Sequence, residues 1–277
     1  MLRATGSGLA PATESCETAA STVAPTDIPP PHPPPRVALI ACSVFESEIA
    51  RHTADMPGIA VIRTLEMGLH DRPDRLRTSL QDEITALDAR ADLDVVVLAY
   101  GLCGMGTAGL RAGRHPLVIP RAHDCFTVFL GSKEKYAAHQ LACPTCYYYT
   151  PGWNRNRRVP GPERLEATRA DLAQRFSPDD VEFLLDTERD AWALHDTATF
   201  IDLDTPDAPA EADYARRCAA WLGWKFEHIK GDPTLLRDLL QGPWDDLRFQ
   251  VVPPGSSLAH SADDAILRLG PPSNTTP

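Results

Sequence analysis

The sequence has 277 residues, of which 43% are hydrophobic, and a formal net charge of -11 at pH 7. This length suits one large α/β domain or two small ones, and the apolar content suffices for a buried core. Binding to duplex nucleic acid depends on neutralising phosphates, so the acidic balance argues against a nucleic-acid partner. No segment approaches the roughly 18 to 20 apolar residues that a bilayer span needs, so no membrane span is expected.

The two ends of the chain differ in composition from its middle. Residues 1–35 hold eight prolines and lack the apolar core of a secretory signal, so they are expected to form a disordered, proline-rich extension. Residues 270–277 are likewise expected to be a disordered tail. We therefore expect a cytoplasmic, reducing location, where cysteines are more often metal ligands or catalytic groups than disulfide partners.

The middle of the chain alternates short apolar runs with helical patterns. Runs rich in β-branched residues predict strands that are buried on both faces. In the clearest helix, apolar residues form one stripe from Leu76 to Leu87. The predicted strands are 37–41, 59–65, 95–99, 117–119, 199–203, 226–229 and 248–252, and the main predicted helices are 73–89, 163–176, 178–187, 211–222 and 233–241.

This order predicts a Rossmann-like α/β domain over residues 36–269, with a mainly parallel sheet and helices on both faces. A division into two sub-lobes near residues 155–162 stays open, because an Arg- and Pro-containing loop is expected there.

A cysteine comes at or just after the end of three predicted strands. Cys42 directly follows the run 37–41, and Cys103 and Cys125 follow the strands 95–99 and 117–119 within a few residues. In an open parallel α/β sheet, ligands bind outside the carboxyl ends of the strands, near the point where the strand order reverses. The sequence therefore predicts three thiols at one crevice.

Thiolates are soft ligands that suit zinc, copper(I) and iron–sulfur clusters. Three protein ligands with an open fourth position are typical of catalytic zinc, and a four-iron cluster held in this way would keep one iron open. The hypothesis depends on topology, because the spacings match no zinc-finger or ferredoxin signature. Two alternatives are a metal-free catalytic cysteine, Cys125 or Cys103, and three thiols that are only packed in the core.

Two titratable side chains accompany Cys125. Period-two alternation along an extended chain would put His123 on the same face as Cys125 and turn Asp124 away. His123 is then a candidate metal ligand, or an imidazolium that lowers the pKa of the Cys125 thiol. Arg121, just before them, is a candidate for holding a substrate carboxylate or phosphate.

Further candidates follow two other strands. Tyr100 directly follows the strand 95–99 and is a candidate acid or hydrogen-bond donor. His70 precedes the helix start at Pro73, so it either caps that helix or takes part in the site. Gly101, Gly104 and Gly106 allow the backbone to approach a cofactor or a neighbouring strand closely.

The pair Cys143 and Cys146, in Cys-Pro-Thr-Cys, has the spacing of a redox dithiol and of half a zinc knuckle. It runs into three tyrosines instead of opening a helix, as a thioredoxin-type motif would. A local dithiol and a peripheral metal clip are both open interpretations.

Several blocks in order resemble a bacterial and archaeal domain-of-unknown-function family, number 1638. They are IACSVFESEI, LEMGLHDRPDRL, LAYGLCGMGTAGLR, PLVIPRAHDCFTVFLGSKEKY and YYYTPGW. The resemblance covers roughly residues 36–253, and Cys143 and Cys146 fall outside the family pattern. That pattern carries over onto Cys42, His70, Pro73, Tyr100, Gly101, Cys103, Gly104, Arg121, His123, Asp124 and Cys125.

The resemblance implies an association with corrinoid-dependent methyl-transfer systems, and hence a corrinoid or a methyltransferase as a partner. We therefore expect an enzyme of methyl or one-carbon metabolism that acts on a small molecule, such as a metal-dependent transferase or lyase. The first alternative is an accessory or carrier protein that binds a metal, cluster or corrinoid for a partner enzyme. The second is a metal-free transferase or hydrolase with a cysteine nucleophile.

Overall fold

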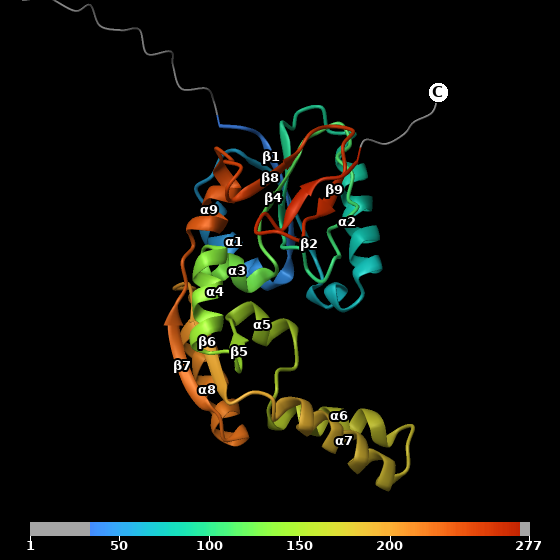
Figure 1. The fold of residues 1–277 in the computed structure, drawn as a ribbon, viewed down its shortest axis with the longest axis vertical. Coiled ribbons are helices and arrows are strands. Elements are labelled where there is room, and N and C mark those ends of the chain that lie inside the picture. Colours follow the sequence, from blue (N-terminus) through green and yellow to red (C-terminus); the bar gives the residue numbers. More distant parts are fainter. Residues whose placement is uncertain (1–33, 272–277) are drawn as a thin grey trace, which may run out of the picture. The chain divides into compact units, whose positions relative to one another are not determined.

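The computed structural model describes residues 34–271, so the predicted extension over residues 1–35 and the tail over 270–277 lie almost wholly outside the described residues. The described chain has a mixed α/β fold with a central sheet of five strands (Figure 1). Four neighbouring strands run parallel and the fifth is antiparallel, which confirms the predicted α/β class and the mainly parallel sheet. In spatial order these strands are β2 (Ile59–Leu65), β1 (Val37–Cys42), β3 (Val95–Ala99), β4 (Leu117–Pro120) and β8 (Phe249–Val252).

The order of the parallel strands reverses beside β1. The chain passes from β1 to β2 on one side, and then returns to place β3 on the other side. Sheets with the order 2-1-3-4 bind ligands outside the carboxyl ends of β1 and β3, where the order switches. The central sheet therefore has a topological binding position at the ends of these two strands.

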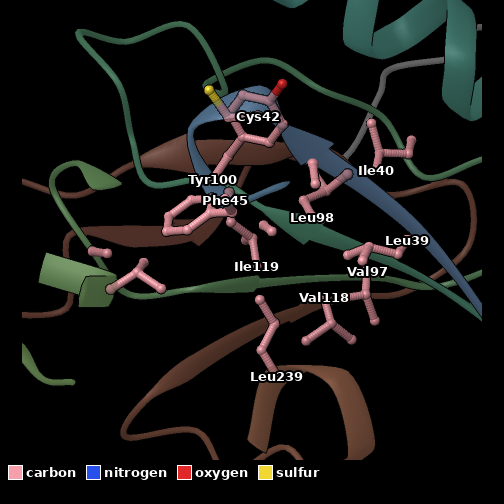
Figure 2. Close-up of a cluster of buried hydrophobic side chains, with 14 of the residues drawn as sticks. Leu39, Ile40, Cys42, Phe45, Val97, Leu98, Tyr100, Val118, Ile119 and Leu239 are labelled. Atoms are coloured by element: carbon pink, nitrogen blue, oxygen red, sulfur yellow. The ribbon is translucent and has the colours of Figure 1, made fainter. Parts of the chain in front are cut away.

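Helices cover both sides of the central sheet, as predicted (Figure 1). Helix α2 (Pro73–Leu87) contacts β1 and buries all four residues of its apolar stripe, including Leu76 and Leu87. Helix α9 (Thr234–Gln241) contacts β3 and β4, and Figure 2 shows Leu239 beneath the strand residues Val118 and Ile119. Because both faces are covered, every residue of β1, β3 and β4 is buried.

A second, wholly parallel sheet lies in the same unit of the chain. Its strands are β5 (Cys146–Tyr149), β6 (Thr197–Asp202) and β7 (Lys225–Lys230), in that order. Helix α8 (Ala208–Leu222) packs on β6 and β7. Strand β5 was not among the predicted strands. The second sheet begins before the loop at residues 155–162, and β8 returns to the central sheet.

The remaining elements connect or flank the two sheets. Helices α6 (Pro162–Ala173) and α7 (Pro178–Trp192) pair with each other around Leu165, Val181, Leu185 and Trp192. Among the described residues, no helix is both long enough and apolar enough to cross a membrane. The others are η1 (Ser43–Phe45), α1 (Glu46–Thr53), η2 (Met67–Asp71), α3 (Cys125–Leu130), α4 (Lys133–Ala142), α5 (Pro151–Asn156), β9 (Leu258–His260) and β10 (Leu267–Leu269).

Candidate functional site

A cavity of about 180 Å³ lies where the chain leaves the carboxyl ends of β1, β3 and β4. Cys42, Cys103 and Cys125 all line it, together with Tyr100 and His70. The three cysteines therefore come together at the position where the strand order reverses. We refer to this cavity as the three-cysteine pocket.

Cys42 and Tyr100 are brought together by the register of two strands. Cys42 is the last residue of β1, and Ala41, just before it, pairs with Ala99 of β3. Tyr100 directly follows Ala99, so its ring stands beside the end of β1, and Figure 2 shows Cys42 and Tyr100 together at this edge of the sheet.

Cys103 lies in a turn whose backbone conformation is rare for residues other than glycine. Cys103, Gly104 and Met105 have φ angles of 47°, 61° and 75° in succession. The left-handed region is costly for a residue with a Cβ, so Cys103 and Met105 are strained positions, and such strain gathers at functional sites. The turn is fixed to the loop after β4, because the backbone N–H groups of Leu102 and Cys103 donate to the carbonyls of Ala122 and His123 at 2.8 and 2.9 Å.

The glycines of this loop contact protein, and none of Gly101, Gly104 and Gly106 is among the residues that line the pocket. A Cβ added at Gly101 would lie 2.7 Å from the backbone nitrogen of Asp124. At Gly106 it would lie 2.6 Å from a methyl carbon of Leu76. Gly101 thus allows the loops after β3 and β4 to touch, which brings Cys103 near Cys125.

Cys125 opens helix α3, and Asp124 caps that helix. The Asp124 carboxylate accepts hydrogen bonds from the backbone N–H of Thr127 at 3.0 Å and from the Tyr136 hydroxyl at 3.1 Å. Because β4 ends at Pro120 and the chain then turns into a helix, the alternation expected of an extended chain does not apply. Asp124 lines the pocket, whereas His123 lines a separate hollow of about 510 Å³ beside Lys133.

Arg121 is held by the C-terminal part of the chain and does not line the pocket. Its guanidinium donates to acceptors that lie more than 120 residues further along the chain. These acceptors are the carbonyls of Asp246, Ala265 and Leu267 and the side-chain oxygen of Gln250.

His70 lines the pocket and also contacts Asp71, Arg157 and Trp153. Its Nε2 atom is 3.4 Å from a carboxylate oxygen of Asp71 and 3.5 Å from a guanidinium nitrogen of Arg157. Its ring stacks on Trp153 at a centroid distance of 6.0 Å, and the Arg157 guanidinium lies over the same indole. His70 is therefore placed between the pocket and an arginine.

Three aromatic side chains that line the pocket, Phe45, Phe126 and Trp153, were not among the residues predicted from the sequence. Phe126 follows Cys125, and Trp153 comes from α5, which directly follows β5; their ring centroids are 4.9 Å apart. Trp153 is part of the block YYYTPGW, which carries the family resemblance, and this was the signal available for it. Cys143 and Cys146 do not line this pocket.

Burial raises the pKa of each thiol in the pocket. The pKa of Cys42 rises to about 11 and that of Cys103 to about 12, and the pKa of Cys125 rises well above its ordinary value. Negative charge on neighbouring groups, including the other pocket cysteines, raises the pKa of Cys103 and Cys125 further. Without a nearby cation, all three thiols are protonated at neutral pH.

The Tyr100 hydroxyl is a buried polar group that lacks a partner. Tyr100 is 3% exposed, and its hydroxyl has no hydrogen-bond partner among the described residues. Burial also raises the pKa of this phenol well above its ordinary value. A buried donor without a partner is costly and needs an explanation, of which a bound group is one.

A family model described as "Protein of unknown function (DUF1638)" matches residues 64–240. The chain belongs to the DUF1638 family. The matched region contains Tyr100, Cys103, Cys125 and Trp153, whereas Cys42 precedes it. No curated protein and no solved structure matches the chain.

In this DUF1638 member the three thiols line one cavity. Among residues 34–271, no group of three or more His, Cys, Asp or Glu side chains is arranged to hold a metal ion. A single zinc ion needs each sulfur at about 2.3 Å. The described residues therefore hold no single-ion site of this kind as they stand.

Proposed function

We propose that the three-cysteine pocket binds an iron–sulfur cluster, and that the protein uses this cluster to act on a small molecule. The observation that carries the proposal is that Cys42, Cys103 and Cys125 line one cavity, from three separate strand ends, together with the partnerless Tyr100 hydroxyl. Packed thiols alone would leave this hydroxyl and the strained turn at Cys103 unexplained.

We favour a cluster over a single ion, because no three-ligand metal site is arranged among the described residues. One zinc ion would draw three sulfurs to one point, whereas a cluster distributes its thiolate ligands over several irons. A cavity of about 180 Å³ among the three cysteines offers room for such a group. A cluster with three protein ligands keeps one iron available to bind a substrate atom.

The pKa values argue against a metal-free nucleophile. Reactive cysteines have a lowered pKa, which supplies thiolate at neutral pH. In this pocket burial raises the pKa of Cys42 and Cys103 to about 11 and about 12. Iron would stabilise the thiolates that the bare pocket disfavours, since a coordinating thiol is deprotonated.

Basic side chains beside the pocket favour a substrate that carries negative charge. Arg157 contacts His70 and lies over Trp153, and both of these residues line the pocket. A hollow of about 320 Å³ shares Met67 with the pocket and is lined by Arg157, Arg158 and Arg164. Their carboxylate partners are Asp71, Asp171 and Glu188, in that order. A carboxylate or phosphate group bound there would orient the substrate toward the cysteines.

A carrier that delivers its cluster to a partner enzyme is the alternative use of the same pocket. A corrinoid macrocycle is far larger than the cavity, so we place any corrinoid on a partner protein. The methyl or one-carbon role stays a prediction from the family resemblance.

Anaerobic purification followed by iron and acid-labile sulfide analysis tests the cluster. We expect brown protein that contains iron and sulfide, and we expect Cys42→Ser, Cys103→Ser and Cys125→Ser each to lose most of both. Cys218→Ser is the matched control, because Cys218 is a buried thiol in α8, outside the pocket, and should leave the iron content unchanged.

Colourless, iron-free protein that also fails to take up iron and sulfide on anaerobic reconstitution would rule out the cluster. If the protein instead contains stoichiometric zinc, and all three pocket variants lose it, the pocket is a single-ion zinc site and not a cluster site. Cluster transfer to an acceptor protein, without turnover of any substrate, would favour the carrier.

A further inference from the structure

A second pair of cysteines lies outside the three-cysteine pocket and has a polar environment of its own. Cys143 follows α4 and Cys146 begins β5, and the turn between them is closed by a 3.3 Å bond from the Cys146 N–H to the Cys143 carbonyl. Cys143 is one of the groups that raise the pKa of the Cys146 thiol, and both thiols are free. Cys143 is partly exposed, whereas Cys146 is buried.

Polar groups surround the buried thiol of Cys146. Its sulfur lies 3.9 Å from Nδ1 of His139 and 3.7 Å from the amide nitrogen of Gln140. The hydroxyl groups of Tyr148 and Thr199 also lie near this sulfur, and both lower the pKa of Cys146 against the larger effect of burial. A cysteine that only filled space in the core would not need this set of donors.

His139 is oriented by a carboxylate. Its Nε2 atom lies 3.1 Å from Glu227, and the same carboxylate oxygen accepts a 2.8 Å bond from the Thr199 hydroxyl. A proton on Nε2 satisfies Glu227, which leaves Nδ1 as the acceptor that faces Cys146 and the Tyr148 hydroxyl, 2.8 Å away. Cys146, His139 and Glu227 thus form a chain of thiol, imidazole and carboxylate.

We propose that Cys143 and Cys146 are a redox-active dithiol that exchanges with external disulfides, with His139 as the base for Cys146. This function is independent of the cluster proposed above. The partly exposed Cys143 attacks one sulfur of the external disulfide, whose S–S bond breaks. A mixed disulfide forms, the first thiol leaves, and the proton lost from Cys143 reaches that thiol through solvent.

Cys146 then completes the exchange. Its proton passes to Nδ1 of His139 while its sulfur attacks the sulfur of Cys143. The mixed disulfide breaks, and the second leaving thiol takes up the proton. One external disulfide becomes two thiols, and the protein dithiol becomes a disulfide.

The position of the pair indicates the direction in which it works. Oxidising dithiols stabilise their thiolate, commonly at a helix N-terminus. Here Cys143 lies at the C-terminal end of α4, and burial raises the pKa of Cys146 to about 11. Burial outweighs the groups that lower the pKa of Cys146, so the reduced form gains no net thiolate stabilisation, and we expect the pair to act as a reductant of disulfides.

Equilibration of the full-length protein in anaerobic glutathione buffers, followed by alkylation and peptide mass mapping, tests the proposal. We expect a Cys143–Cys146 disulfide that dithiothreitol reverses. Cys146→Ser should accumulate glutathione on Cys143, whereas Cys143→Ser should form no intramolecular disulfide. Cys218→Ser is the control and should behave as the wild type.

The rate at which the second thiol is released tests the role of His139. In His139→Gln, release of the second thiol should slow roughly 100-fold at neutral pH, while formation of the mixed disulfide should not change. An unchanged rate of release of the second thiol in His139→Gln would show that His139 is not the base for Cys146. The absence of a Cys143–Cys146 disulfide at every glutathione ratio would overturn the proposal, as would one zinc per chain that is held by both cysteines and prevents their oxidation.

Discussion

The Tyr100 hydroxyl and the Cys42 thiol line the same cavity at the ends of two neighbouring parallel strands (Figure 2). Negative charge on Cys42 raises the pKa of Tyr100, so the two groups interact electrostatically. Neither group can ionise at low cost in this cavity, because burial disfavours the charged form of both. The pocket therefore holds polar groups at a cost in stability.

Tyr100→Phe should raise the free energy of unfolding of the metal-free protein by about 1 kcal/mol, because it removes a buried hydroxyl that has no partner. If the Tyr100 hydroxyl contacts a bound cofactor, Tyr100→Phe should no longer raise the free energy of unfolding of the protein that carries this cofactor. Urea unfolding of both forms measures the difference. Tyr149→Phe is the control: that hydroxyl donates to the Pro160 carbonyl, so its removal should cost about 1 kcal/mol. A loss of stability in metal-free Tyr100→Phe would contradict the prediction.

Arg121→Lys should lower the free energy of unfolding by about 2 kcal/mol, because lysine cannot reproduce a guanidinium that donates to several acceptors at once. Chemical denaturation measures this loss. Arg268→Lys, on an exposed arginine of β10, should change stability by no more than about 0.5 kcal/mol. Unchanged stability together with weaker substrate binding in Arg121→Lys would support the substrate role that the sequence predicts for Arg121.

Glu48 makes stability depend on pH. It is 1% exposed, neither carboxylate oxygen has a hydrogen-bond partner among the described residues, and burial raises its pKa from 4.5 to about 7. The folded state therefore binds this proton more tightly than the unfolded state does. The cost of ionising Glu48 is absent below about pH 4.5, grows as the pH rises, and reaches about 3 kcal/mol above pH 7.

Glu48→Gln removes that cost. We expect the variant to unfold at higher urea concentration than the wild type at pH 8, and at a similar concentration at pH 4.5. Glu46→Gln, on the exposed side of the same helix, should show no such dependence. An equal urea midpoint for Glu48→Gln and the wild type at pH 8 would show that Glu48 is paired or solvated in the folded protein.

The meeting of Cys42, Cys103 and Cys125 was predictable, because carboxyl ends of neighbouring parallel strands share one edge of a sheet. The apolar runs gave the strand positions closely: β2 and β3 match their predicted bounds. The helix stripe of α2 was equally clear, although this helix ends at Leu87 and not at residue 89. Local hydrophobic patterns decide these features.

The side chains around the thiols depend on contacts that no local pattern records. Whether His123 or Asp124 faces the pocket depends on where the chain turns from β4 into α3, and the Asp124 cap sets that point. The acceptors of Arg121 come from residues 246–267, and Trp153 reaches the pocket from an element that follows an unpredicted strand. Long-range packing decides these features, and a single sequence does not show it.

Gly101→Ala should damage the pocket through the backbone alone. The added Cβ would lie 2.7 Å from the Asp124 nitrogen and 2.9 Å from the Ala122 carbonyl oxygen, and neither backbone atom can move without shifting the loop that carries Cys125. We expect a loss of about 1–3 kcal/mol in the free energy of unfolding, together with loss of bound iron. Gly68→Ala is the control, because its Cβ would meet only a side-chain oxygen of Glu66 at 3.7 Å. Wild-type stability and iron content in Gly101→Ala would mean that the loops after β3 and β4 do not need this close contact to bring Cys103 and Cys125 together.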